Sequence, residues 1–162
     1  MFCVSIITVN QMSTSLAEDT TITRINTCPV EELSNPHLKG EYKEISRVFT
    51  STIKCINRHG LKKAYRYIKN KQPSAYTVQT KDNPKGGQGH EMFFRDKLKY
   101  IEDRYLDLTT EMQRRGYSPN EDMVLSVIDN AHKVVVDKRY WNDYIPTPEA
   151  YELNKKRRIE MS

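Results

Sequence analysis

Residues 35–60 read NPHLKGEYKEISRVFTSTIKCINRHG and decide the fold. Pro36 suits the first position of a helix, Ser34 or Asn35 can cap that end, and Gly60 suits the stop. Between these signals, apolar residues recur every three or four positions, which places them on one stripe of a helix. The stripe consists of Leu38, Tyr42, Ile45, Phe49, Ile53 and Ile56. The sequence therefore predicts one long amphipathic helix.

The opposite face of this helix is basic, with one carboxylate embedded in it. At 100° per residue, Lys43, Arg47, Lys54 and Arg58 fall on this face, and Glu44 lies between the first two. Lysine and arginine suit phosphate contacts, whereas a glutamate repels phosphate and needs a reason on such a surface. Taken alone, the helix favours a solvated face on which Arg47 stabilises Glu44 three residues away.

The composition indicates a single domain whose first candidate partner is nucleic acid. The chain has 162 residues and a formal net charge of +5, and its pI of about 9.0 suits an acidic partner. Mean hydropathy is −0.75, and no apolar run approaches the roughly 18 residues of a membrane span. We therefore expect a soluble protein without a membrane partner.

The three cysteines predict neither a disulfide framework nor a metal centre. Cys3, Cys28 and Cys55 are odd in number and scattered, and no Cys or His spacing is typical of zinc ligands. Reduced thiols in a cytosolic compartment are the expected state. We predict no metal and no cofactor.

A second helical seam is predicted over residues 90–115, before Gly116. Apolar residues there alternate steps of four and three: Phe94, Leu98, Ile101, Tyr105, Leu108 and Met112. Because this seam matches the first stripe in length, we expect the two helices to pack together.

Shorter segments complete the expected fold. Helices are predicted over residues 61–71, over 119–133 and from Thr147 to the KKRR run at 155–158, whereas the prolines and glycines of 72–89 predict a loop. Residues 1–22 show no sustained period, so we expect a disordered arm before one domain over residues 23–162. The expected class is all-α: a small compact helical bundle with three main helices and irregular connecting loops.

Several short stretches, taken in order, resemble a known family. They are TRIN at 23–26 with HLKGEYKEISRVF at 37–49, then GQGHEMFFRDKLKY at 87–100 and NDYIP at 142–146. This set is similar to the T-even phage pyrimidine-dimer DNA glycosylase/AP lyases of the endonuclease V type. The resemblance covers roughly residues 23–158, with an insertion in the 69–87 loop.

The resemblance implies a monomeric DNA repair enzyme of a bacterial or phage-infected cytoplasm. Such an enzyme excises cyclobutane pyrimidine dimers from duplex DNA and nicks the abasic site through a Schiff base. By resemblance the nucleophile is the α-amino group of Thr23, and the essential acid is Glu44. The DNA-binding residues that it implies are Arg24, His37, Lys43, Arg47, His90 and Arg157. For His37, a surface histidine at a helix start is an equal alternative.

This chemistry needs an unprotonated amine. An α-amino group has a pKa of about 7.7–8.0, against about 10.4 for lysine, so far more of it is free base at neutral pH. Neighbouring Arg24 and Arg47 are expected to lower that pKa further. The negative charge of Glu44 would stabilise the oxocarbenium-like sugar and the iminium.

The position of Thr23 departs from the family pattern. Ile22 precedes Thr23 where an initiator methionine is expected, and within the printed chain Thr23 has an amide in place of an amine. Three explanations are open: translation starting at Ile22 from an unusual codon, proteolytic removal of the arm, or changed chemistry. In the third case a lysine such as Lys39 or Lys43 is the nucleophile, or the protein is a catalytically silent DNA- or RNA-binding module. A weaker alternative is a basic accessory protein that binds an acidic protein.

Overall fold

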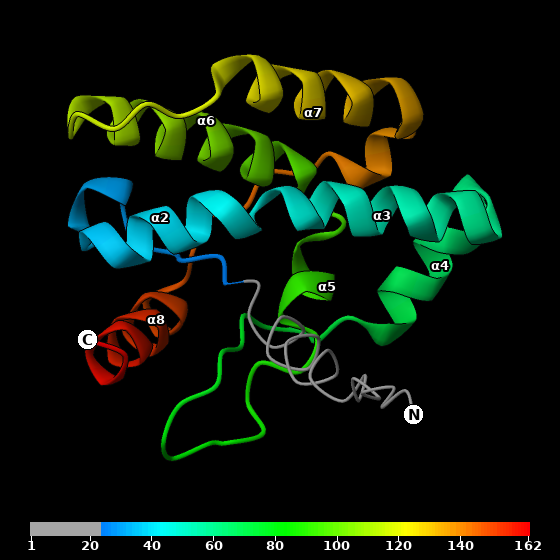
Figure 1. Ribbon diagram of the computed structural model, residues 1–162. Helices are drawn as coiled ribbons and strands as arrows, with labels where there is room; N and C mark the ends of the chain where they lie inside the picture. The colour runs from blue at the N-terminus through cyan, green and yellow to red at the C-terminus, as the bar shows by residue number, and fades with distance from the viewer. Residues whose placement is uncertain (1–23) are drawn as a thin grey trace, which may run out of the picture.

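The computed structural model describes residues 24–162, and within this range helices and loops build the fold (Figure 1). Six α-helices of ten or more residues are α2 (Asn35–Glu44), α3 (Ser46–His59), α4 (Leu61–Lys71), α6 (Leu98–Arg114), α7 (Glu121–Val134) and α8 (Pro148–Glu160). The short α5 (His90–Phe94) and the 3₁₀ turns η1 (Val30–Glu32) and η2 (Lys138–Tyr140) complete this part of the chain. The all-α class is confirmed for the described residues.

The expectation of three main helices is wrong: α4, α7 and α8 are as long as α2 or longer, and the first predicted helix divides at Ile45. That residue keeps right-handed helical angles, with φ −60° and ψ −33°, so α3 continues nearly in line with α2 (Figure 1). The Val48 N–H donates to the carbonyl of Ile45 at 3.2 Å, a tight i→i+3 bond that interrupts the α-helical pattern. Gly60 ends α3 as predicted, at φ 80°, a conformation that side chains other than glycine rarely adopt.

The second predicted helix also divides, over residues 95–97. Lys97 leaves the helical conformation and its backbone pairs with that of Trp141 in an isolated antiparallel bridge. The Asn142 amide donates to the carbonyl of Asp96 at 2.8 Å. Long-range pairing with residues 141–142 therefore replaces the helical bonds that the local sequence favours.

The last two helices begin at side-chain caps. Asn120 accepts a bond from the Met123 N–H, so α7 begins at residue 121 rather than at the predicted 119. Thr147 accepts a bond from the Ala150 N–H and opens α8 as predicted.

The helices form two layers about the line of α2 and α3 (Figure 1). On one side α6 packs against α2 and α3, and α7 packs against α3 and α6. On the other side lie α4, α5 and α8 (Figure 1). Among the described residues, no helix has the length and apolar character needed to cross a membrane.

The two predicted apolar stripes form the core. All six residues of the second seam are buried, and so are Leu38, Ile45, Phe49 and Ile56 of the first. Tyr42 and Ile53 are partly buried against the same cluster. The predicted packing of the two seams is confirmed, since α2 and α6 lie against each other.

A buried ion pair joins α2 to α6 in the middle of this apolar contact. The Glu41 carboxylate and the Arg104 guanidinium are 2% and 7% exposed. Two bonds link them, from Arg104 Nε to Oε1 at 2.8 Å and from a terminal nitrogen to Oε2 at 3.0 Å. Each carboxylate oxygen also accepts one bond from Asn26, whose backbone N–H lies 3.1 Å from Oε1 and whose amide lies 2.6 Å from Oε2. This carboxylate therefore fixes α2, α6 and the entering chain in one place.

We predict strong coupling between Glu41 and Arg104. Replacing either residue with methionine strands the other charge in the core, at a cost of about 3–5 kcal/mol of unfolding free energy. The double variant strands neither, so its loss is expected to be clearly smaller than the sum of the two single losses. Chemical denaturation of the four proteins measures this difference.

A matched control is the exposed pair of Asp129 and Lys133 on α7, where the corresponding double-variant cycle is expected to show little coupling. Additive losses at Glu41 and Arg104 would contradict the assignment of a shared structural role to this pair.

Candidate active site

Residues 25–27 form an extended strap that buried side chains hold in place. Each of their backbone N–H groups donates to a side chain from a different helix. The bonds are Ile25 to His90 Nε2 at 2.8 Å, Asn26 to Glu41 Oε1 at 3.1 Å, and Thr27 to Asn154 Oδ1 at 3.2 Å. Buried N–H groups need such partners, so these three side chains of α5, α2 and α8 fix the path of the strap.

The carbonyl groups of Ile25, Asn26 and Cys28 are satisfied in the same way. The hydroxyl of Tyr76 donates to Ile25 at 2.9 Å, and that of Tyr100 donates to Asn26 at 3.1 Å. Arg104 donates to the carbonyl of Cys28. The Asn154 amide also donates to the Asn26 side chain at 2.7 Å, which closes the network. The strap is therefore held on both edges by side chains, without a neighbouring strand.

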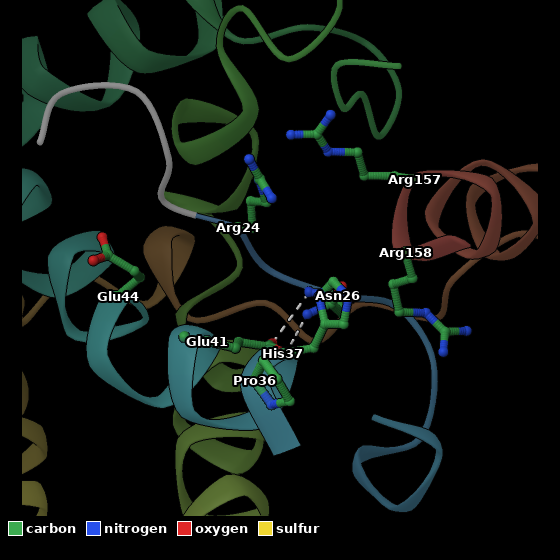
Figure 2. A pocket seen from close by; sticks show the side chains of 9 residues that line it. Arg24, Asn26, Pro36, His37, Glu41, Glu44, Arg157 and Arg158 are labelled. Carbon is green, nitrogen blue, oxygen red and sulfur yellow. Dashed lines mark hydrogen bonds between the residues drawn. The ribbon is translucent and has the colours of Figure 1, made fainter. Parts of the chain in front are cut away.

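Beside the strap lies a pocket of about 230 Å³ between α2 and α8. Its lining combines cations, one partly exposed carboxylate and the open backbone of a glycine: Arg24, Asn26, Pro36, His37, Gly40, Glu41, Glu44, Arg157 and Arg158. We call this the strap pocket. Figure 2 shows Arg24 between Glu44 on one side and Arg157 and Arg158 on the other.

The sequence-based candidates Arg24, His37, Glu44 and Arg157 thus come together although they lie far apart in the chain. Lys43 is exposed and does not line the strap pocket. Thr23 lies outside the described residues, so the structure does not test its predicted role.

The charges of the strap pocket favour an anion. Burial, and secondly the charge of Arg157, lower the pKa of the Arg24 guanidinium to about 10. The Nε atoms of Arg157 and Arg158 are buried and donate to no acceptor among the described residues. Arg24 and Arg157 lie close enough to repel each other, so a phosphate bound beside them would offset their charge and could accept a hydrogen bond from an arginine.

Glu44 lies at the edge of the cationic surface rather than in the core. Its side chain is 24% exposed, and Arg47 lies 2.7 Å from Oε2. The ion pair that the sequence suggested at this three-residue spacing is present. The negative charge of a carboxylate in this position can stabilise positive charge on a bound sugar.

His37 faces the same arginines. Burial, followed by the charges of Arg158, Arg24 and Arg157, lowers the pKa of its imidazole. At neutral pH His37 is therefore an uncharged polar group in the pocket wall.

His90, which the sequence suggested as a residue beside DNA, has a structural role in this fold. Its ring is 6% exposed, and both nitrogens bind protein. Because Nε2 accepts the Ile25 N–H, Nδ1 carries the proton and donates to the carbonyl of Thr77 at 2.7 Å. His90 holds the strap, and it also lines a neighbouring pocket of about 210 Å³ that shares Arg24 and Arg157 with the strap pocket.

Apart from His90, the residues that fix the strap were missed at the sequence level. Glu41 lies three residues after Leu38 and four before Ile45, and Arg104 lies three after Ile101 and four before Leu108. Opposite charges therefore occupy matching positions on the two apolar stripes, a detectable sign of a buried pair. Asn154 carried no comparable signal.

The comparison with known proteins assigns the family. Residues 22–125, more than half of the chain, match the family described as pyrimidine dimer DNA glycosylase. The protein belongs to this family, whose members repair pyrimidine dimers in DNA. The match includes the strap, α2 and His90, whereas Asn154 and Arg157 on α8 lie beyond it. Within residues 24–162, no cluster of three or more His, Cys, Asp or Glu residues could hold a metal ion.

We predict that Gly40 keeps the strap pocket open. A Cβ added at Gly40 meets nothing within 4 Å, so Gly40→Ala is expected to raise the unfolding free energy by about 1 kcal/mol through helix propensity. Gly40→Leu keeps a good helix former but fills the pocket. Binding to duplex DNA that contains a dimer should weaken roughly tenfold or more, about 1.4 kcal/mol, without loss of stability.

Fluorescence anisotropy and thermal unfolding of both variants measure the two effects, and Gly40→Ala is the control for the backbone change. Full binding by a stable Gly40→Leu protein would show that DNA does not enter this pocket.

We also predict that the folding stability depends on pH through His90. Burial lowers its pKa to about 4, compared with about 6.5 in an unfolded chain. Between these values the unfolded state binds more protons, so stability present above about pH 6.5 is lost as the pH falls towards 4. The expected loss is up to about 3 kcal/mol.

Denaturant titrations at several pH values test this expectation. The His90→Gln protein retains His37 and should lack only the part of the slope that His90 contributes. If the unfolding free energies of the unaltered and His90→Gln proteins changed with pH in parallel, the buried neutral ring of His90 would not be the source of the pH dependence.

Proposed function

We propose that this protein excises cyclobutane pyrimidine dimers from duplex DNA and cleaves the resulting abasic site. The α-amino group of Thr23 is the nucleophile and Glu44 is the acidic partner. One observation carries the proposal: the strap delivers Arg24 into the same cationic pocket as Glu44. Thr23 is bonded to Arg24, and consecutive Cα atoms are about 3.8 Å apart, so the amine of a chain that begins at Thr23 starts beside this pocket.

The chemistry follows from an amine next to a carboxylate. The amine nitrogen bonds to C1′ of the damaged nucleotide, the bond between C1′ and the base breaks, and the base leaves with the electron pair and takes up a proton. The nitrogen loses a proton, the C1′–O4′ bond opens, and an iminium forms while O4′ is protonated. Loss of a C2′ proton then breaks the C3′–O bond, which releases the 3′ phosphate by β-elimination.

Glu44 supports these steps through its charge and its proton affinity. Its negative charge stabilises the cationic sugar and then the iminium. It is also the group we propose to move protons during ring opening and elimination. Arg24, Arg157 and Arg158 supply the contacts that hold the phosphates on either side. Lys43 and Arg47, on the exposed face of α2 and α3, extend this surface.

The positions of the alternative lysines favour Thr23. The Lys39 ammonium lies over the ring of Tyr117, 4.2 Å from its centroid, and does not line the strap pocket. Lys43 is exposed and lies outside the pocket as well. An α-amino group also has a pKa more than two units below that of lysine, at about 7.7–8.0. The proposal therefore requires that the peptide bond between Ile22 and Thr23 be absent in the active protein. We expect that protein to act as a monomer.

Borohydride trapping tests the proposal. A chain that begins at Thr23 and the full 162-residue chain are incubated with a duplex carrying a single thymine dimer. We predict a covalent adduct and a nicked strand with the first protein and neither with the second. Glu44→Gln in the shorter chain should keep DNA binding but slow excision by roughly 10²–10⁴-fold, the usual contribution of a positioned acid or base.

Glu149→Gln, an exposed carboxylate at the start of α8, is the control for loss of one negative charge. Equal trapping by the full-length chain would exclude the Thr23 amine. Tight binding with no adduct from either chain would indicate a catalytically silent DNA-binding module.

A further inference from the structure

A second basic pocket lies at the far end of α3, outside the strap pocket. It has a volume of about 200 Å³ and is enclosed by α3, α4 and the segment after α5. Its charged lining consists of Lys54, Arg58 and Arg95, without an acidic residue. We call it the distal pocket.

The distal pocket carries more positive charge than its surroundings neutralise. Arg95 pairs with Glu91 at 3.1 Å. Lys54 and Arg58 are exposed, and neither forms an ion pair with a residue in the described part of the chain. Two uncompensated cations in a concave site attract a phosphate and gain from its binding through counterion release.

An aromatic pair forms one wall. The rings of His59 and Tyr67 stack with centroids 5.3 Å apart, and Tyr67 is 41% exposed. The stack places a rigid surface beside the cations, which separates this site from an ordinary solvated row of lysines. A ring of this kind can lie against a sugar or a base.

The distal pocket lies on the same ridge as the candidate acid. Glu44, Arg47, Lys54 and Arg58 occur at spacings of three, seven and four residues, so they share one face of the nearly continuous α2–α3 line (Figure 1). At about 1.5 Å per residue, Lys54 and Arg58 lie roughly 15 and 21 Å along the axis from Glu44. That separation is too long for the nucleotide under attack.

The same separation matches DNA that flanks the lesion. One strand of B-DNA places a phosphate about every 3.4 Å along the helix axis, so 15–21 Å corresponds to roughly four to six base pairs. We propose that the distal pocket binds the phosphodiester backbone of the duplex at this distance from the lesion, and thereby sets the length of flanking duplex that the protein needs. The inference rests on the proposed function for the position of the lesion.

The test varies the length of the flank. Duplexes carry a dimer with about 2 or about 10 base pairs on one side and a long arm on the other, and each side is shortened in turn. The protein should bind more tightly when one particular flank is extended, because only the long flank reaches the distal pocket. The Lys54→Gln/Arg58→Gln protein should lose most of that gain, roughly tenfold in Kd. On duplexes with the short flank, its Kd should equal that of the unaltered protein.

Salt dependence gives a second readout. On long duplexes, with or without a dimer, the double variant should reduce the slope of log K against log salt by about 0.9 for each phosphate that the protein no longer neutralises. Its excision rate at saturating duplex should be unchanged. The control is Lys99→Gln/Lys133→Gln, which removes the same charge from exposed sites on α6 and α7 and should keep the flank effect.

Equal binding losses on short and long flanks, or none on either, would overturn the inference. A preference of the distal pocket for single-stranded over duplex flanks would also overturn it and assign the Tyr67 wall to an unpaired base. Because binding to undamaged duplex needs no chemistry, the salt-dependence result is independent of whether borohydride trapping succeeds.

Discussion

The bonds that the Glu41 carboxylate accepts hold the rest of the structure in place. Its two oxygens receive four donors, two from Arg104 and two from Asn26. A buried ion pair contributes little net stability by comparison with packed apolar side chains, because both charges lose their hydration. Its value here is positional: no apolar pair could hold the backbone N–H of Asn26 at a defined point between two helices.

The fixed position of the strap determines where Arg24 lies in the pocket. With the strap fixed, Arg24 is partly buried close to Arg157. Burial first, and then repulsion by Arg157, lower the pKa of Arg24. Repulsion of this kind destabilises the free protein and is relieved when an anion binds, which is typical of a site built for a charged ligand. The buried network thus positions Arg24, whereas the crowding of arginines destabilises the free protein. Both features act on the pocket that we propose to hold a chain start, a carboxylate and DNA phosphates.

The sequence predicted the helices better than their arrangement, and four of its candidate residues line one pocket. Local periodicity located the apolar stripes. They are buried because the apolar face of a helix is removed from water only when it packs against another element. The breaks at Ile45 and after α5 were missed, since the second depends on pairing with Trp141, far away in the chain. Glu41 and Arg104 were missed because charged residues are rarely buried unless paired, and the partner belongs to another helix. His90 was singled out as a DNA-binding candidate, but its burial beneath the strap is a product of tertiary structure.

Amide hydrogen exchange at residues 25–27 tests the central claim most directly. These three N–H groups belong to no helix or sheet, so a strap held only loosely would exchange them as fast as an exposed loop. The account predicts that the amides of Ile25, Asn26 and Thr27 exchange as slowly as the core amides of α6, with free energies of opening close to that of global unfolding. Rapid exchange at all three in the folded protein would contradict the view that Glu41, His90 and Asn154 hold the start of the domain beside its candidate acid.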